Sequence, residues 1–477
     1  MQLIWFRQDL RIADHTALWH ATQAGPTIAV VFISPEQSIL HHDAPVKNIF
    51  YLRQLESLKT QLNTLNIPLI IQEVALWKDI PHALNQLCLA LKIQCIHANV
   101  EIGVNELQRD FQAQKISEKN HIPFELYHDR TLFPVGSILN KSNLPYQVFG
   151  AFKKQCYEHL SISLPQCYPA IQTQQILNID LSSYQTVIHF EQYYPDDAMT
   201  SLQQLWPVSE QYAFNLLDHF THNDLAHYNT QRDFPNLNAT SQLSPYLNIG
   251  VISIRQCLRA IFSAQQGHFH LDNSGQQTWL DELLWREFYQ HILFHFPKIS
   301  KYQPFKSNTN QLQWRQSEED LMAWQQGQTG IPIVDAGMRQ LLHTGWMHNR
   351  VRMIVAMFLS KNLLIDWRLG EAWFMQHLID GDLAANNGGW QWCASTGTDA
   401  VPYFRIFNPV SQSQKFDANG DYIRKWVPEL AHLDVKRIHD PFINHPNDSS
   451  LHYPKPIVDL KHSRIRAIQA FKSISSA

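Results

Sequence analysis

The sequence predicts an α/β N-terminal domain with a doubly wound parallel sheet, joined by a long linker to an all-α domain. Three observations predict this fold class. Apolar β-branched runs alternate with amphipathic stretches over residues 1–130, a proline-rich stretch covers residues 131–200, and helical periodicity dominates residues 201–477. We therefore place the domain boundaries near residues 130 and 200.

Five short apolar runs in the first domain are expected to form strands. They are Leu3 to Phe6, Thr27 to Ile33, Pro68 to Val74, Gln94 to Asn99 and Phe124 to His128. Helical patterns lie between them, and the clearest runs from Val46 to Leu65. Short connections between strand and helix predict a parallel sheet that is covered on both faces. No GxGxxG or GxxxxGK[ST] motif follows a strand, so a standard dinucleotide or P-loop phosphate cradle is excluded.

The linker and the second domain differ in pattern. Residues 131–200 carry Pro134, Pro145, Pro165, Pro169 and Pro195 among polar residues and show no clear period, which is typical of a long connection between two domains. After Ser201 the strand signals fade. The helical stretches are Gln211 to Asn223, Ser253 to Ala264, Thr278 to Phe296, Val334 to His343, His348 to Leu364 and Gly370 to Leu378.

Composition limits the classes of protein to consider. Of the 477 residues, 44% are hydrophobic and 17% are charged, as expected of a globular protein with more than one core. The formal net charge is -4, so a nucleic-acid partner would have to bind a local basic face. Six cysteines without a CxxC pair or zinc-ligand spacing predict neither a metal site nor a structural disulfide.

The N-terminus and the apolar runs bear on localisation. Charged residues between Arg7 and Asp14 interrupt the start of the chain, and we expect no signal peptide. The longest apolar runs, such as Met353 to Leu359, are too short to cross a bilayer. The sequence thus predicts a cytoplasmic protein with no membrane contact.

The helix that begins at Thr278 has a mixed aromatic and charged face. On a helical wheel, Trp279, Glu282, Arg286 and Gln290 share one face, and the opposite face is apolar. This arrangement could be an ordinary solvated face with an i, i+4 ion pair of small energy. It could also be one wall of a site.

Two further segments carry unusual polar residues. In GWMHNRVRM, Asn349 and Met353 are i, i+4 neighbours on a helix and would contact the same object, although a buried amide that caps a loop is an alternative. Residues 380–392, DGDLAANNGGWQW, are costly to bury unless each polar group has a partner. A bound heterocycle would supply such partners, whereas a metal is disfavoured because no histidine cluster lies near Asp380 and Asp382.

Seven motifs of the chain are distinctive: WFRQDLR from residue 5, YNTQRDFP from 228, WLDELLWREFYQH from 279, GWMHNRVRM from 345, IDWRLGE from 365, DGDLAANNGGWQWCASTGTDA from 380 and YFRIFNP from 403. In these motifs the sequence resembles the class I cyclobutane pyrimidine dimer photolyases of the photolyase and cryptochrome family. The motifs span almost the whole chain. The resemblance implies an antenna-binding α/β domain, a linker, and a helical domain that binds FAD and DNA.

The resemblance implies a set of flavin-binding residues. They are Tyr228, Thr240, Ser241, Gln242, Leu243, Ser244, Trp279, Arg352, Asp380, Gly381, Asp382 and Asn386, with Asn386 beside flavin N5. Hydroxyls and amides at 240–244 are suitable phosphate donors. Family members often carry Arg where this chain has Gln242, so one charge-assisted contact to the pyrophosphate is missing and lower flavin affinity is expected.

A dimer must leave the duplex to reach the flavin, and photolyases are among the enzymes described as base flippers. The resemblance places four side chains against the flipped dimer: Glu282, Asn349, Met353 and Trp392. Glu282 would form a hydrogen bond to the 5′ base. The implied DNA-binding residues are Arg232, Glu282, Trp285, Arg286, Tyr289, Asn349, Arg350, Trp392, Arg405 and Gln412. For Arg405 an interhelical salt bridge is the alternative.

Two further groups of residues follow from the resemblance. Trp390, Trp367 and Trp314 match a chain that relays an electron to the oxidised flavin, although each tryptophan alone would be read as core. His41, Asn105, Glu106 and Lys301 match contacts to a 5,10-methenyltetrahydrofolate antenna. A deazaflavin, or no antenna, would leave much of the same sheet unchanged.

The resemblance implies the activity of a deoxyribodipyrimidine photo-lyase, a carbon-carbon lyase in which light drives an electron from reduced FAD to a cyclobutane dimer in DNA. It also implies a monomer with no obligate protein partner. Two alternatives lie within the family: a cryptochrome-type photoreceptor and a 6-4 photolyase. The mechanism of a 6-4 photolyase depends on a pair of pocket histidines, and His348 is present here. A DNA-binding module without flavin is the alternative outside it, and it would be colourless.

Overall fold

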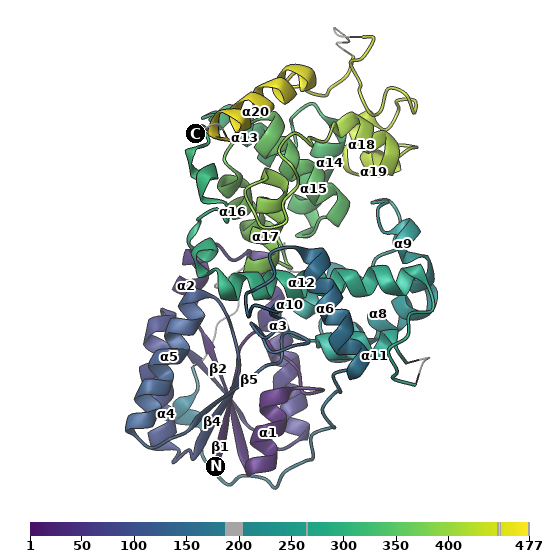
Figure 1. The fold of residues 1–477 in the computed structure, drawn as a ribbon. Helices are drawn as coiled ribbons and strands as arrows, with labels where there is room; N and C mark the ends of the chain where they lie inside the picture. The colour runs from purple at the N-terminus through teal and green to yellow at the C-terminus, as the bar shows by residue number, and fades with distance from the viewer. Residues whose placement is uncertain (187–203, 264–265, 446–447, 449, 476–477) are drawn as a thin grey trace. The chain divides into compact units, whose positions relative to one another are not determined.

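The computed structural model describes residues 1–186, 204–263, 266–445, 448 and 450–475. The end of the predicted linker, residues 187–200, lies outside the described residues. The chain divides into two compact units (Figure 1). Unit 1 comprises Met1–Ala226 and Ser241–Pro297, and unit 2 comprises His227–Thr240 and Lys298–Ala477.

A five-stranded parallel sheet forms the centre of the N-terminal part of unit 1. Its strands are β1 (Gln2–Phe6), β2 (Thr27–Ile33), β3 (Leu69–Glu73), β4 (Cys95–Asn99) and β5 (Phe124–Tyr127), in the order β3-β2-β1-β4-β5. All four pairings are parallel. The predicted fold class and all five predicted strands are therefore confirmed. The strand order reverses at β1, and in open α/β sheets ligands bind outside the carboxyl ends of the strands at such a point.

Helices cover both faces of this sheet (Figure 1). They are α1 (Thr16–Ala24), α2 (Pro35–Leu40), α3 (Pro45–Thr64), α4 (Ile80–Ala90) and α5 (Val104–Lys119). On one face, alternate strand residues such as Leu3, Trp5 and Val30 pack with Leu84 and Leu87 of α4. Because both faces are covered, the strands are near-continuous apolar runs, which is why they could be recognised in the sequence.

Unit 1 also contains helices from later in the chain. They are α6 (Phe149–Ile162), α8 (Glu210–Asn223), α10 (Ser244–Asn248), α11 (Ile254–Ile261) and α12 (Ser274–His295). Buried ion pairs join them to the sheet region: Arg255 of α11 pairs with Asp129 at 2.8 Å and Asp14 at 3.0 Å. Asp129 also pairs with Arg11 at 2.6 Å. These two guanidinium groups hold the pKa of Asp129 well below its usual range despite its burial.

Helix α6 lies in the predicted linker, which shows no clear period in the sequence. Its buried residues Phe149, Phe152, Cys156 and Leu160 form a stripe along one side and pack on α12. The spacing of three and four residues is helical, but it is surrounded by prolines and polar residues that hide it in a longer window. The predicted linker therefore contains a 14-residue helix.

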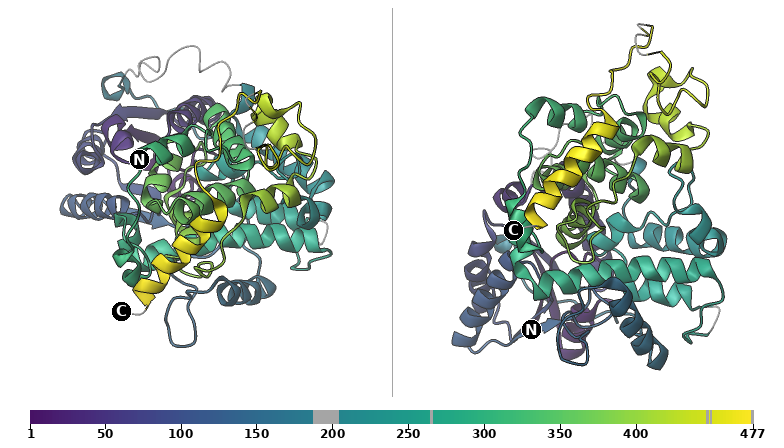
Figure 2. Two further views of the ribbon diagram at one scale, coloured as in Figure 1. Left: turned by 90° about the horizontal axis from the view of Figure 1, so that it is seen from above. Right: turned by 45° about the horizontal axis from the view of Figure 1, so that its top comes forward.

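Unit 2 is helical. Its helices are α9 (Tyr228–Gln231), α13 (Glu318–Gln325), α14 (Pro332–Thr344), α15 (Asn349–Met357), α16 (Trp367–His377), α17 (Leu383–Ala394), α18 (Pro409–Phe416), α19 (Asp421–Trp426) and α20 (Leu460–Ser475). One core cluster of apolar side chains runs through α14 to α17 and α19. Helix α20, drawn in yellow in Figure 2, packs along the chain between α15 and α16.

The helix predicted from His348 to Leu364 differs in its second half. Helix α15 ends at Met357, and Phe358–Asn362 form a π-helical turn, η7. Such turns are rare and occur frequently at functional sites. In the part of the chain that the structure describes, no helix is long and apolar enough to cross a membrane.

Candidate functional site

The mixed face of α12 is the face with Trp279, Glu282, Arg286 and Gln290, and it is buried or half-buried within unit 1. Trp279 is 3% exposed and lies 4.9 Å from the ring of Phe220. Arg286 donates hydrogen bonds from its guanidinium to the backbone oxygens of Arg130 at 2.7 Å and Leu247 at 3.4 Å. The solvated-face alternative is therefore wrong for Trp279 and Arg286. Glu282, between them on the same face, is half-buried.

The residues expected to bind the flavin phosphates divide between the units: Ser241 to Ser244 belong to unit 1, whereas Tyr228 and Thr240 belong to unit 2. The Leu243 amide points to Ser241 Oγ at 3.5 Å, and Ser244 is the first residue of α10. Gln242 has φ +51°, in the left-handed region that non-glycine residues rarely adopt. The turn thus occupies a sparsely populated backbone conformation, which is typical of ligand-binding segments.

Unit 2 brings the segment 380–392 against α15 and α16. Both carboxylate oxygens of Asp380 accept from Arg352, at 2.8 Å and 3.0 Å, and Arg352 also donates to the backbone oxygen of Met347 at 2.7 Å. Asp382 caps α17 by accepting from the Ala385 amide at 2.8 Å. Gly381 lies between the two carboxylates. Each charged group of this segment therefore has a partner within unit 2.

Asn386 lies on α17 and is fixed by α16. Its amide nitrogen donates to the backbone oxygen of Glu371 at 3.0 Å, so its own carbonyl oxygen is the atom with which it can accept a hydrogen bond from a ligand. Glu371 accepts from Asn387 at 2.8 Å, and burial raises the pKa of Glu371 to about 7. Sequence reasoning assigned no role to Glu371, although it stands in IDWRLGE. A glutamate between apolar helical positions was the available signal.

The residues expected at the dimer occupy neighbouring helices. Asn349 and Met353 lie one turn apart on α15, while Trp392 lies on α17, and both Met353 and Trp392 pack on the same apolar core. His348 caps α15, and burial lowers its pKa to about 4, so the imidazole is neutral at neutral pH. Its Nε2 is buried with no hydrogen-bond partner among the described residues, as expected of a group that faces a ligand.

Three basic or polar candidates for DNA contact lie around α9, α15 and α18. Arg350 pairs with Asp233 at 2.7 Å and stacks 4.4 Å over the Phe416 ring. Arg232 lies 5.4 Å over the Tyr228 ring. Gln412 lies on α18. Arg405 is exposed, and the described residues offer it no ion pair, which argues against the salt-bridge alternative.

The three tryptophans of the expected relay are graded in burial. Trp390 and Trp367 are 2% and 1% exposed, whereas Trp314 is partly exposed beside α20. Trp390 contacts Phe374 at 5.0 Å and Trp324 at 6.0 Å between ring centroids. Its Nε1 is buried and finds no partner among the described residues. Burial thus separates Trp314 from the other two tryptophans, which are equally enclosed.

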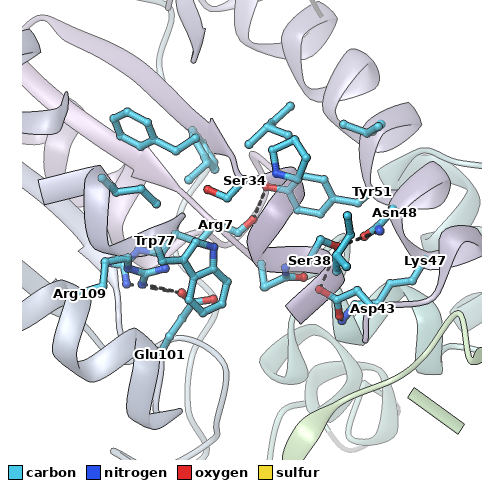
Figure 3. Close-up of a pocket in the computed structure, with 18 of the residues that line it drawn as sticks. Arg7, Ser34, Ser38, Asp43, Lys47, Asn48, Tyr51, Trp77, Glu101 and Arg109 are labelled. Carbon is cyan, nitrogen blue, oxygen red and sulfur yellow. Dashed lines mark hydrogen bonds and ion pairs between the residues drawn. The ribbon is translucent and has the colours of Figure 1, made fainter. Parts of the chain in front are cut away.

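A pocket of about 400 Å³ opens at the carboxyl ends of β1 and β2 in unit 1 (Figure 3). The Arg109 guanidinium lies between the rings of Trp5, at 4.8 Å, and Trp77, at 5.1 Å, and it pairs with Glu101 at 2.8 Å. Tyr51 donates to the backbone oxygen of Arg7 at 2.9 Å. The volume and the aromatic walls suit a planar ligand. Sequence reasoning missed this pocket, although the ends of parallel strands were its available signal.

The pocket also contains unpaired polar atoms. Among the described residues, Ser34 Oγ, Gln8 Oε1 and two guanidinium nitrogens of Arg7 are buried without a hydrogen-bond partner. Buried polar atoms without partners are rare in folded proteins, and a ligand that bonds to them is a common explanation. The chemistry of this lining therefore fits a heterocycle with acceptor and donor atoms.

Three of the four expected antenna residues lie beside this pocket. His41 contacts Trp77, with ring centroids 4.7 Å apart, and its Nε2 lies 2.8 Å from the Asn105 amide nitrogen. Glu106 is half-buried, and burial together with the nearby Glu101 raises its pKa to about 7. Lys301 ends a short 3-10 helix, Pro297–Lys301, and belongs to unit 2. No described group of three or more His, Cys, Asp or Glu side chains could hold a metal.

Comparison with protein families gives two matches. Residues 2–170 match the family described as DNA photolyase, and residues 279–473 match the family described as the FAD binding domain of DNA photolyase. Together the two matches cover more than half of the chain.

Similar proteins extend over the whole chain. The chain is 42% identical to a deoxyribodipyrimidine photo-lyase of Vibrio cholerae, over 99% of both proteins, and 40% identical to one of Escherichia coli, over 99% of this chain and 98% of the other. Among solved structures, a bacterial class III photolyase from Agrobacterium tumefaciens superimposes with a TM-score of 0.86 at 32% identity, covering 100% of this chain and 98% of that one. A cryptochrome from Synechocystis gives a TM-score of 0.86 at 27% identity, covering 98% and 99%.

Proposed function

The chain belongs to the DNA photolyase family, and on this premise we propose that it is a deoxyribodipyrimidine photo-lyase that splits cyclobutane pyrimidine dimers in DNA under blue or near-UV light. The observation that carries the proposal is full-length identity of about 40% to several proteins of that name. The residues expected to bind flavin and dimer are present at every position except Gln242. We assign residues 1–130 to antenna binding and 201–477 to FAD and DNA binding.

The residues present fit FAD. Arg352 with Asp380, the amide of Asn386 and the ring of Trp279 would hold the flavin and its nucleotide, and the hydroxyls at 240–244 would hold the phosphates. When bound in its reduced form, FAD supplies the light-driven electron that opens the dimer and takes it back afterwards. The chain supplies binding, orientation and the electrostatic setting for that chemistry.

The dimer is proposed to contact Glu282, Asn349, Met353 and Trp392. Met353 and Trp392 offer an apolar and an aromatic surface on which extruded bases can stack. Glu282 is half-buried on the same face of α12 as Trp279, and we propose that it hydrogen-bonds to the 5′ base and stabilises negative charge that develops there. Asn349 is exposed at the start of α15, and its amide can donate as well as accept.

DNA phosphates are proposed to bind Arg232, Arg350, Arg405 and Gln412, with Trp285, Arg286 and Tyr289 on α12 at the same duplex. Trp285 is held in place by Phe149, whose ring stacks on it at a centroid distance of 3.7 Å. Because the net charge is -4, DNA affinity must come from this local set and should fall steeply with salt. We propose that Trp314, Trp367 and Trp390 carry an electron inward when the bound flavin is oxidised.

We propose 5,10-methenyltetrahydrofolate as the antenna, held by His41, Asn105, Glu106 and Lys301. A photolyase from Sulfolobus tokodaii, 29% identical with a TM-score of 0.82 over 99% of this chain, was solved with two FAD molecules, and its description implies a novel light-harvesting cofactor. The pocket at the ends of β1 and β2 therefore makes a flavin the competing antenna here. Chromatography of the chromophores released by heating distinguishes folate, a second flavin and no antenna.

The cell compartment and the oligomeric state are proposed together. All six cysteines are unpaired thiols, which supports a reducing compartment such as the cytoplasm. We propose that the protein acts as a monomer without an obligate protein partner, which size-exclusion chromatography with light scattering would test.

The proposed activity is tested by exposing a thymine-dimer oligonucleotide to the purified, reduced protein under blue light, with a dark control and a 6-4 photoproduct substrate. Light-dependent splitting of the cyclobutane dimer alone is expected. Protein that binds FAD but repairs neither lesion would instead be a receptor like the cryptochromes, to which the fold is also similar. A Glu282→Ala variant should keep its flavin and lose repair yield, and an unchanged yield would remove Glu282 from the mechanism.

A further inference from the structure

Lys361 is a buried lysine in unit 2 with no role in the proposed activity. It lies in the π-helical turn η7, and its side chain is completely buried. Its Nζ donates to Ser395 Oγ at 2.7 Å and lies 3.8 Å from the centre of the Phe471 ring on α20. Neither partner carries a negative charge. A buried ammonium without a carboxylate is costly and needs an explanation.

The turn that carries Lys361 packs against the tryptophans proposed to form the relay. Trp314 contacts Phe471 with ring centroids 6.4 Å apart, so Lys361 Nζ lies within about 10 Å of the Trp314 ring centre. The residue after Trp314, Arg315, hydrogen-bonds to the backbone oxygens of Leu363 and Leu364. The chain therefore runs from Lys361 past the Trp314 segment directly to Trp367 at the start of α16.

The surroundings of Lys361 favour the loss of its proton. Burial is the main reason that its pKa falls to about 7, and the nearby Lys306 lowers it further. Cys393 on α17 stays a neutral thiol, since burial raises its pKa to about 12. From the other elements, Arg466 of α20 donates to the Asn362 backbone oxygen and Arg315 donates to the Leu363 backbone oxygen, so two further basic side chains contact this turn.

We propose that Lys361 is a positioning residue that controls the tryptophan relay through its charge: the ammonium hinders, and the neutral amine permits, the outward movement of positive charge to Trp314. The proposal rests on the relay that forms part of the proposed function. In the step concerned, one electron leaves the relay for the oxidised flavin, and the positive charge left behind moves to the Trp314 indole. A soluble one-electron donor, ferrocyanide, then returns one electron to that indole and becomes ferricyanide.

The size of the effect follows from the distance. A unit charge about 10 Å away, in a medium of effective dielectric constant near 20, changes the equilibrium for placing a second positive charge by about tenfold. Acid should therefore slow photoreduction by about that factor, and the change should be centred near neutral pH. A purely structural lysine would give no such profile.

The test measures photoreduction of the oxidised FAD holoenzyme between pH 6 and pH 8.5 by ferrocyanide, a one-electron donor that does not titrate in this range. In the parent protein we expect the rate to rise about tenfold with pH. Lys361→Met, which removes the charge, should be fast at every pH, and Lys361→Arg, which fixes it, should be slow at every pH. In a matched control, Lys306→Met should keep the profile and move its midpoint to higher pH, since Lys306 lowers the pKa of Lys361.

Two outcomes would overturn the proposal: Lys361→Met keeps the parent profile, or Lys361→Met and Lys361→Arg lose photoreduction equally. Dimer splitting by the dithionite-reduced parent protein separates this question from the proposed function, since splitting does not use the relay. If the parent protein splits dimers but its photoreduction does not depend on pH, the inference about Lys361 fails alone. If it neither binds FAD nor splits dimers, the proposed function fails.

Discussion

Gly370 offers a direct test of how unit 2 holds Trp390. It lies within α16, and a Cβ built on it would be 2.1 Å and 2.5 Å from two ring carbons of Trp390 and 2.7 Å from Leu359 Cδ2. The ring and the leucine are both buried, so neither can move away freely. A Gly370→Ala variant must therefore displace the Trp390 indole or strain the helix.

The expected magnitude combines two opposing effects. Alanine stabilises a helix interior by about 1 kcal/mol relative to glycine. An extra methyl group in a well-packed core costs about 1–3 kcal/mol. The free energy of unfolding should therefore fall by up to about 2 kcal/mol. Photoreduction of FAD should slow as well, because Trp390, one of the three tryptophans of the proposed relay, is moved.

Gly150→Ala is the matched control. Gly150 lies in α6 and is exposed, and no atom would lie within 4 Å of its Cβ, so the same substitution should raise stability by up to about 1 kcal/mol and leave photoreduction unchanged. Thermal unfolding of both variants and photoreduction of their holoenzymes measure the difference. If Gly370→Ala is as stable as Gly150→Ala and photoreduces at the parent rate, the reasoning about close packing around Trp390 is refuted.

Three further predictions concern stability and DNA binding. The folded-state pKa of Glu371, about 7, lies above the ordinary glutamate value of 4.5, so the folded protein holds a proton that the unfolded chain has lost. Stability should therefore fall as pH rises between these two values. In denaturant titrations, Glu371→Gln should reduce the difference in unfolding free energy between pH 5 and pH 8 by about 2–3 kcal/mol. An unchanged difference would contradict the raised pKa of Glu371. Asp129→Asn leaves the two buried guanidinium groups of Arg11 and Arg255 without a full counter-charge, and the free energy of unfolding should fall by about 3–5 kcal/mol. Thermal unfolding should show a large drop in the midpoint. A drop of a degree or two would show that this ion-pair network contributes little to stability. Phe149→Ala removes the ring stacked on Trp285 and should weaken binding to a dimer-containing duplex about three- to tenfold without loss of FAD, and unchanged affinity would separate Trp285 from DNA binding.

Local sequence pattern was enough to predict most of the strands and helices. The five strands could be predicted because a parallel sheet covered on both faces needs uninterrupted apolar runs, and these runs stand out between polar helices. Helix α12 was recognisable from its period, and the motifs between residues 5 and 409 were specific enough to indicate the family. Helix α6 was missed because its four apolar residues are diluted by prolines and polar residues on either side.

The helical wheel of α12 shows the limit of what local sequence pattern can predict. It placed Trp279, Glu282 and Arg286 on one face, but it could not show whether that face was solvated or buried. The structure answers this with residues far away in the chain: Phe220 covers Trp279, and the backbone oxygens of Arg130 and Leu247 bind Arg286. Such partners have no signature in the sequence around position 280.

The sequence by itself determined the fold class, the family and the identity of the residues expected to bind flavin and DNA, because these depend on local periodicity and on long specific motifs. Only the tertiary structure decided that Trp5, Trp77 and Arg109 line a pocket and that Lys361 is buried with no carboxylate partner among the described residues. The physical reason is that burial and pairing depend on which segments meet in space. Lysine is almost never fully buried, so the sequence alone would place Lys361 at the surface, whereas in the structure Ser395 and Phe471 of α20 enclose its side chain.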